Sequence, residues 1–207
     1  MVLLASFKLF FFTAKNGLLE KDTSNETNGI IKTFFEYPKR SFATFTDSFH
    51  SVSTEILWPV WIKIIGAGSV AAGFLYAFTV SMKLVVSPLA GYLTNNQNST
   101  ELKYGALLKI FGWLPWAFTL NPLTSLISSV FFAGGSHMFR VGIEAKWYRA
   151  KTYTHLACRE ITHGVGRLIA YSILIPVLFY TPHFFVLIGA LFSACAYSAA
   201  CALKNAP

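Results

Sequence analysis

The sequence predicts an all-α, multi-pass helical membrane protein with about four transmembrane helices and an N-terminal amphipathic interfacial helix. The chain of 207 residues is 54% hydrophobic and only 13% charged, whereas a typical soluble domain carries about 25% charged residues. Residues 168–203 contain no Asp, Glu, Lys or Arg, and this run is too long for one crossing, which needs about 20 apolar residues. This number of charged residues is too small to cover a water-facing surface. Lipid must therefore surround much of the chain in place of water.

Charge and cysteine placement argue against two kinds of partner, nucleic acid and zinc. The formal net charge is +8, but basic residues stand at the ends of apolar runs instead of forming a dense patch. This placement is typical of positive-inside anchoring beside anionic lipid headgroups. Cys158, Cys195 and Cys201 form no C-x-x-C pair, so neither a disulfide framework nor a zinc site is predicted.

The N-terminal region, residues 1–56, is expected to lie at the membrane surface. Residues 1–14 are apolar but interrupted by Lys8 and too short to span. They favour an interfacial anchor over a targeting peptide, because no clear cleavage site follows. Residues 15–30 are polar and mixed in charge, which indicates a loop or linker.

An amphipathic helix is expected over residues 40–56, starting near Pro38. Bulky apolar side chains repeat there at spacings of three and four and fall on one face, opposite a face rich in Ser and Thr. This pattern is typical of a helix in the headgroup layer; alternatively, its apolar face packs on the protein's own transmembrane helices or on a partner. The predicted membrane-interface residues are Phe42, Phe45 and Phe49, with Trp58 and Trp61 just before the uncharged run of the first span.

The first transmembrane helix is expected over residues 57–82. Lys63 and Lys83 bracket an uncharged run in which small residues recur every four positions. Lipid gives helices little hydrophobic reason to associate, so close backbone approach over small residues supplies the packing. The stripe therefore predicts a helix–helix contact face, formed by Ser69, Gly73, Ala77 and Ser81.

The second span is expected over residues 110–139 and is broken at 121–122. Asn121 can cap a new helix and Pro122 can occupy its first position. The break produces either one kinked span with an interfacial lead-in over 104–120 or a re-entrant pair. Irregular backbone at membrane depth must be buried in protein or line water, so the second alternative would place a cavity here.

Two closely spaced spans, residues 161–180 and 183–203, complete a transmembrane domain that extends over residues 57–203. Pro182 separates them, because proline cannot continue a helix from the preceding turn. The last span carries a second stripe of small residues, which we expect to meet the first stripe or an identical surface on a partner. This stripe consists of Ala190, Ala194, Ser198 and Ala202.

Lys and Arg counts by segment predict that both termini lie on the cytoplasmic side, or on the equivalent face of an organelle membrane. Four crossings put the basic segment at residues 140–167 on that side together with the region before the first span. Asn98 is then expected on the opposite side.

A redox or headgroup site is the one chemical site that the sequence indicates. His137 and His163 lie near the ends of adjacent predicted spans, with Arg140 and Arg167 close by, as binding of a haem propionate, a quinone carbonyl or a phosphate would require. The sequence contains no G-x-S-x-G, H-E-x-x-H or Gly-rich phosphate loop. It places no acidic residue inside a predicted span, which argues against proton- or cation-coupled transport.

These observations favour a non-catalytic structural or assembly subunit, or an anchor, of a larger membrane complex. The expected partners are membrane lipids and other membrane-protein subunits or a second copy of the chain; no nucleic acid is expected, and no cofactor beyond bound lipid. Two alternatives stay open. One is a membrane-shaping protein that uses apolar hairpins and the Ser/Thr-faced helix as wedges, and the other is a haem- or quinone-binding redox anchor.

Overall fold

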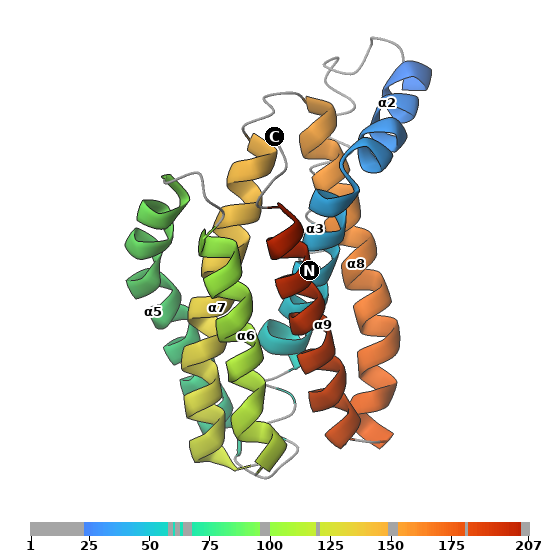
Figure 1. The fold of residues 1–207 in the computed structure, drawn as a ribbon. Coiled ribbons are helices and arrows are strands. Elements are labelled where there is room, and N and C mark those ends of the chain that lie inside the picture. The colour runs from blue at the N-terminus through green and yellow to red at the C-terminus, as the bar shows by residue number, and fades with distance from the viewer. Residues whose placement is uncertain are drawn as a thin grey trace.

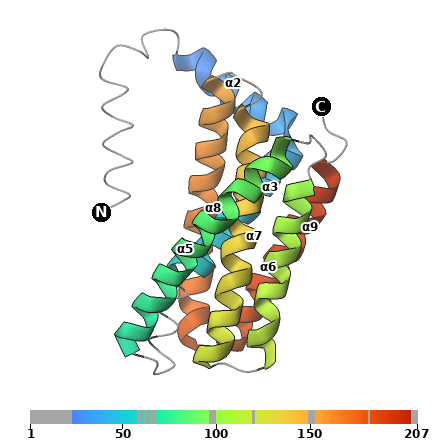
Figure 2. The ribbon, with the colours of Figure 1, turned by 90° about the vertical axis from the view of Figure 1, so that its left-hand side faces the viewer.

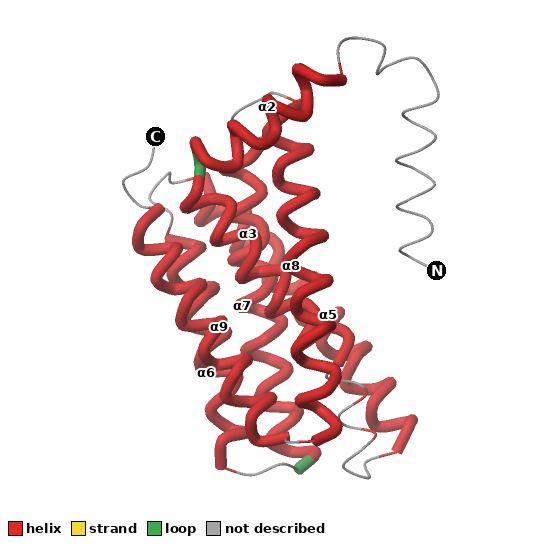
Figure 3. Tube along the Cα trace, turned by 90° about the vertical axis from the view of Figure 1, so that its right-hand side faces the viewer, coloured by secondary structure: helices red, strands yellow, loops and turns green. Residues whose placement is uncertain are grey.

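The computed structural model describes residues 23–57, 60, 63, 68–95, 100–118, 121–148, 153–180 and 182–203. The described residues are almost entirely helical, and none of them lies in a strand (Figure 3). Four helices are long and apolar enough to cross a membrane, which confirms the predicted all-α, multi-pass membrane fold. They cover Gly68–Thr94, Leu123–Tyr148, Tyr153–Phe179 and His183–Ala202.

The helices form an elongated bundle around a buried N-terminal helix (Figure 1). α5 to α9 run alternately up and down the bundle in chain order, α3 descends between them, and α2 lies at one end against α8. α3 continues into a π-helical segment, η1. The bounds are α2 Thr23–Glu36, α3 Pro38–Ser51, η1 Val52–Leu57, α5 Gly68–Asn95, α6 Thr100–Phe118, α7 Pro122–Tyr148, α8 Tyr153–Tyr180 and α9 Pro182–Ala202.

The predicted breaks at 121–122 and at Pro182 are confirmed. The Asn121 side chain accepts a hydrogen bond from the Thr124 backbone N–H (2.9 Å), and Pro122 begins α7, where its missing N–H costs nothing. α6 and α7 form an antiparallel pair packed along their lengths (Figure 1). The alternative of one kinked span is therefore wrong, because the chain reverses direction at Asn121.

The pairing of α6 with α7 changes the predicted topology. The end of α5 and the start of α6, Asn95 and Thr100, lie at the same end of the bundle as Tyr148 and Tyr153 (Figure 1). Asn98 itself lies outside the described residues. The prediction that this connection and the basic segment lie at opposite ends is wrong, because α6 runs back along the bundle as a separate helix, although it is not one of the four candidate membrane spans.

Two predicted span boundaries also shift. The first apolar helix begins at Gly68 and runs through Pro88 to Asn95, whereas residues 57–82 were expected to span. α8 begins at Tyr153, eight residues before the expected start. The polar connection at 140–167 is mostly helical, because α7 and α8 extend into it.

The helix predicted over residues 40–56 exists and starts at Pro38, but it does not lie at the interface. Phe49 is fully buried and stacks on Phe192, with ring centroids 3.6 Å apart. Phe45 is half-buried, and Phe42 is 46% exposed. Trp58 and Trp61 lie outside the described residues.

The Ser/Thr face of α3 explains its burial. Thr44 accepts a hydrogen bond from the Trp147 indole (2.9 Å), Ser48 bonds His163 (2.5 Å), and Ser51 accepts one from Arg140. Hydroxyls that find partners inside the bundle lose little on leaving water. The apolar face thus packs on the protein's own helices, and residues 38–57 share one core with the domain predicted over 57–203.

Glycines set the closest helix contacts. Gly105 of α6 and Gly135 of α7 face each other so closely that a Cβ on Gly135 would lie 2.7 Å from the Gly105 carbonyl oxygen. On α9, a Cβ on Gly189 would lie 2.2 Å from the Trp113 ring. Backbones approach at these points only because no side chain intervenes.

Gly105→Ala should lower the free energy of unfolding by about 1–3 kcal/mol, the usual cost of overpacking. A Cβ at Gly105 would lie 2.6 Å from the Phe139 backbone nitrogen, which cannot move aside alone. Gly164→Ala on α8 is the matched control, since nothing lies within 4 Å of its Cβ position. Thermal unfolding in mild detergent measures both; equal melting temperatures would contradict the observed α6–α7 contact.

Candidate functional site

A chain of five alternating charges crosses the interior of the bundle. The Lys109 ammonium donates to Asp47 Oδ1 (2.6 Å), and Arg140 Nε lies 3.4 Å from Asp47 Oδ2. Arg140 Nη2 lies 3.4 Å from Glu55 Oε1, which also accepts a hydrogen bond from the Lys83 ammonium (2.6 Å). We call this set the ion chain; its members come from α6, α3, α7, η1 and α5 in that order.

Burial decreases along the ion chain. The Lys109 side chain is fully buried and that of Asp47 is 5% exposed, whereas Glu55, Lys83 and Arg140 are 22–30% exposed. Lys109 also lies over the Phe139 ring, 4.0 Å from its centroid, which adds a cation–π contact. Buried charges are tolerated only when paired and hydrogen-bonded, so Asp47 and Lys109 depend on each other.

His50 is the centre of a second buried polar group, one turn from Asp47 on α3. Its Nε2 bonds Ser136 of α7 (3.0 Å), and its Nδ1 lies 3.4 Å from Ser193 of α9. Ser193 also accepts a hydrogen bond from the Trp113 indole (3.1 Å). His50 thus ties α3 by polar contacts to α7 and α9.

Three of the four residues predicted to form a redox site contact different partners. His137 bonds Ser87 of α5 (3.0 Å), His163 bonds Ser48, and Arg140 belongs to the ion chain. Arg167 is half-buried on α8. A haem or quinone site here stays a prediction. In the described part of the chain no group of three or more His, Cys, Asp or Glu side chains could hold a metal ion.

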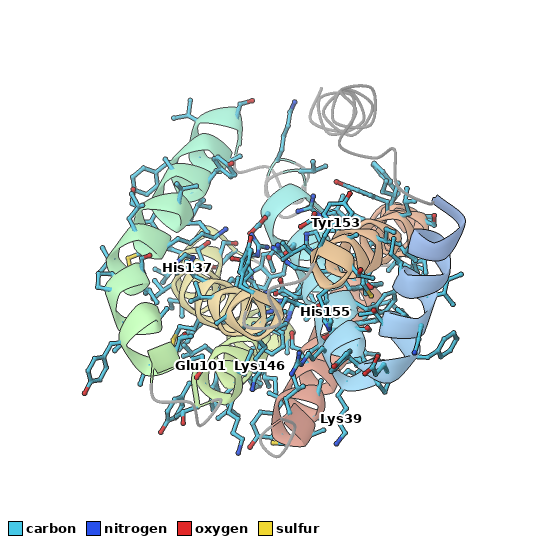
Figure 4. All side chains as sticks on the ribbon, turned by 90° about the horizontal axis from the view of Figure 1, so that it is seen from above. Lys39, Glu101, His137, Lys146, Tyr153 and His155 are labelled. Atoms are coloured by element: carbon cyan, nitrogen blue, oxygen red, sulfur yellow. The ribbon has the colours of Figure 1, made fainter. Side chains whose placement is uncertain are left out.

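The two stripes of small residues do not meet within the chain. All four members of the first stripe are exposed, and nothing lies within 4 Å of a Cβ on Gly73. In the second stripe Ala190 is half-buried, and Ala194, Ser198 and Ala202 are exposed. Viewed from above, α6 and α7 separate α5 from α9 (Figure 4). Contact between the stripes inside one chain is therefore wrong, and contact with a partner stays a prediction.

Sequence reasoning missed four members of the ion chain: Lys83, Lys109, Asp47 and Glu55. Lys109 and Lys83 do interrupt or end apolar runs, and Asp47 and Glu55 lie two turns apart on the polar face of one amphipathic helix. These two carboxylates enter the bundle from α3 and η1, which lie outside the predicted spans. The predicted spans contain no acidic residue, but because these two carboxylates reach the interior from another helix, that absence no longer argues against ion-coupled transport.

Family models, curated proteins and solved structures were compared with the chain, and none of them matches. Functional inference therefore depends on the contacts, burial and charge described above.

Asp47→Asn should destabilise the protein by about 3–5 kcal/mol, because it leaves Lys109 buried without a counter-charge. Glu144→Gln, which breaks the more exposed Glu144–Arg159 pair (2.6 Å), should cost only about 0–1 kcal/mol. The double change Asp47→Leu with Lys109→Met should cost less than Asp47→Asn alone, since it removes both buried charges. Thermal unfolding of all three variants checks this order, and equal losses for Asp47→Asn and Glu144→Gln would refute it.

Proposed function

We propose that this protein is a non-catalytic structural or assembly subunit of a larger membrane complex, with α5 as its docking helix. The observation that carries the proposal is the first stripe of small residues, which faces outward. Stripes at four-residue spacing are typical of helix–helix contacts in lipid. This one makes no such contact with the described helices, so a helix of another subunit would complete it. Its members are Ser69, Gly73, Ala77 and Ser81.

The loose attachment of α5 supports the same proposal. Only 11% of the most apolar 18-residue stretch of α5 is buried, compared with 61% of the corresponding stretch of α7. α5 packs chiefly on α7 and crosses it at an angle (Figure 2). A helix with this much unpartnered surface can present a second face to another protein without disturbing the core around α3.

The two alternative functions have less support. A membrane-shaping role depended on the Ser/Thr-faced helix acting as a wedge in the headgroup layer, and that face is buried in the bundle. A redox anchor requires a site shared by His137 and His163, and each of these bonds a different serine. Neither alternative is carried by a contact of the described residues.

We also propose that the end of the bundle holding the α7–α8 connection faces the cytoplasm or its equivalent. Lys39 and Lys146 lie at this end (Figure 4), and Lys103 lies in the first turn of α6 at the same end. An excess of basic residues on the cytoplasmic side is the positive-inside pattern. The start of α3 and the end of α9 lie at this end too (Figure 1).

Gly73→Leu should abolish association with the partner, or with a second copy of the chain, while leaving the fold intact. The new side chain meets open space within the chain but would fill a seam that needs a small residue. Gly164→Leu is the matched control, as it too points into open space but lies outside either stripe. Crosslinking in native membranes, followed by size measurement in mild detergent, tests both variants.

The outcome separates docking from simple lipid exposure. If Gly73→Leu and Gly164→Leu yield the same crosslinked species as the unmodified chain, α5 does not dock a partner and the proposal is wrong. Equal melting temperatures for all three proteins establish that any loss of association is not a loss of folding.

Orientation can be tested with single cysteines at the two ends of the bundle. In a chain whose native cysteines are replaced, Tyr153→Cys should react with a membrane-impermeant thiol reagent only from the cytoplasmic side. His183→Cys should react only from the other side, since α8 separates the two positions by the length of the bundle. Labelling of His183→Cys from the cytoplasm would reverse the proposed orientation.

A further inference from the structure

The outer members of the ion chain open onto the side of the bundle along α5 and α7. Lys83 and Arg140 belong to two of the four candidate spans, yet their side chains are 22% and 30% exposed. Ser87 and His137, which bond each other across the same two helices, are exposed and half-buried. We call these four residues, with Glu55 behind them, the α5–α7 polar seam.

The polar seam lies below the ends of the helices. Arg140 is eight residues from the end of α7, or about 12 Å at 1.5 Å per residue, and Lys83 is twelve residues from the end of α5, or about 18 Å. α5 and α7 are longer than the roughly 30 Å hydrocarbon core that they would cross. With the hydrocarbon core centred on α5 and α7, the exposed cationic groups lie beneath the headgroup layer, where a charge facing lipid tails is unfavourable unless water or a polar ligand covers it.

The sign of the charge indicates what covers them. The ion chain contains three cations and two carboxylates, so one positive charge is not balanced within it. Below Lys83 on α5, Val80 and Tyr76 are exposed and apolar on the same side of the helix. A positive, hydrogen-bonding seam above an apolar surface matches a molecule with an anionic head and an apolar tail.

We propose that the α5–α7 polar seam binds the anionic headgroup of a membrane amphiphile, with its tail lying along α5. Arg140 and Lys83 donate to the phosphate or carboxylate oxygens, and His137 lies beside them. Glu55 and Asp47 keep the two cations in place and limit the site to one negative charge. No residue that contacts the headgroup belongs to the small-residue stripe of α5, so headgroup binding does not require docking of another subunit.

Native mass spectrometry of the full chain, released from nanodiscs, tests the proposal. The nanodiscs contain equal amounts of phosphatidylglycerol and phosphatidylcholine. We expect the protein to retain phosphatidylglycerol preferentially, and Lys83→Gln to reduce this retention about tenfold, the effect of losing one charge-assisted hydrogen bond. Lys83→Arg should restore it. Lys39→Gln makes the same change of charge on an exposed residue outside the seam and should leave retention unchanged.

Each result supports or overturns the site. Retention by Lys83→Gln equal to that of Lys39→Gln would overturn it. Displacement of phosphatidylglycerol by oleate would support an anionic amphiphile whose head is a carboxylate, whereas displacement by inorganic phosphate alone would assign the seam to a free anion and overturn the lipid proposal. Arg140→Gln provides a second measurement, in which retention is compared only if its melting temperature shows that it folds.

Discussion

The carboxylate of Asp47 lies between Lys109 and Arg140, and the position of α3 depends on this contact. A helix so rich in Ser and Thr has no reason to enter an apolar bundle unless its polar groups find partners there. A buried ion pair seldom adds net stability over apolar packing, but breaking one half of it is costly. The ion chain therefore acts mainly as a constraint on register, because it allows α3 to sit at only one height and rotation among α6, α7 and α9.

The same constraint explains how the bundle is divided into tight and loose parts. α7, α8 and α9 pack around α3, and where α6 meets α7 and α9 isolated glycines stand opposite bulky groups such as Trp113 and Phe139. α5 touches this core along one side only, so it adds membrane surface without adding much core. Regular stripes of small residues lie on the exposed faces, and the contacts that hold the chain together use single glycines instead.

The two sides of α5 indicate different roles for this helix. Its outward small residues suit a neighbouring helix, while Lys83 on its inner edge belongs to the ion chain and reaches the α5–α7 seam. A subunit that holds both features would place a charged seam beside a contact with its partner. The described residues thus combine a packing surface and a polar site within about five turns of α5.

The sequence by itself determined the helical membrane fold, the apolar runs and the breaks at Asn121 and Pro182. These follow from local causes: a proline lacks an N–H, a capping side chain reaches only a few residues, and apolar length is read directly along the chain. Only the tertiary structure decided that α3 is buried and that α6 is a separate pass. Arg140 pairs with Asp47 and Glu55, which are 93 and 85 residues away in sequence. Such distant residues become partners only because the helix faces that carry them meet in the packed bundle.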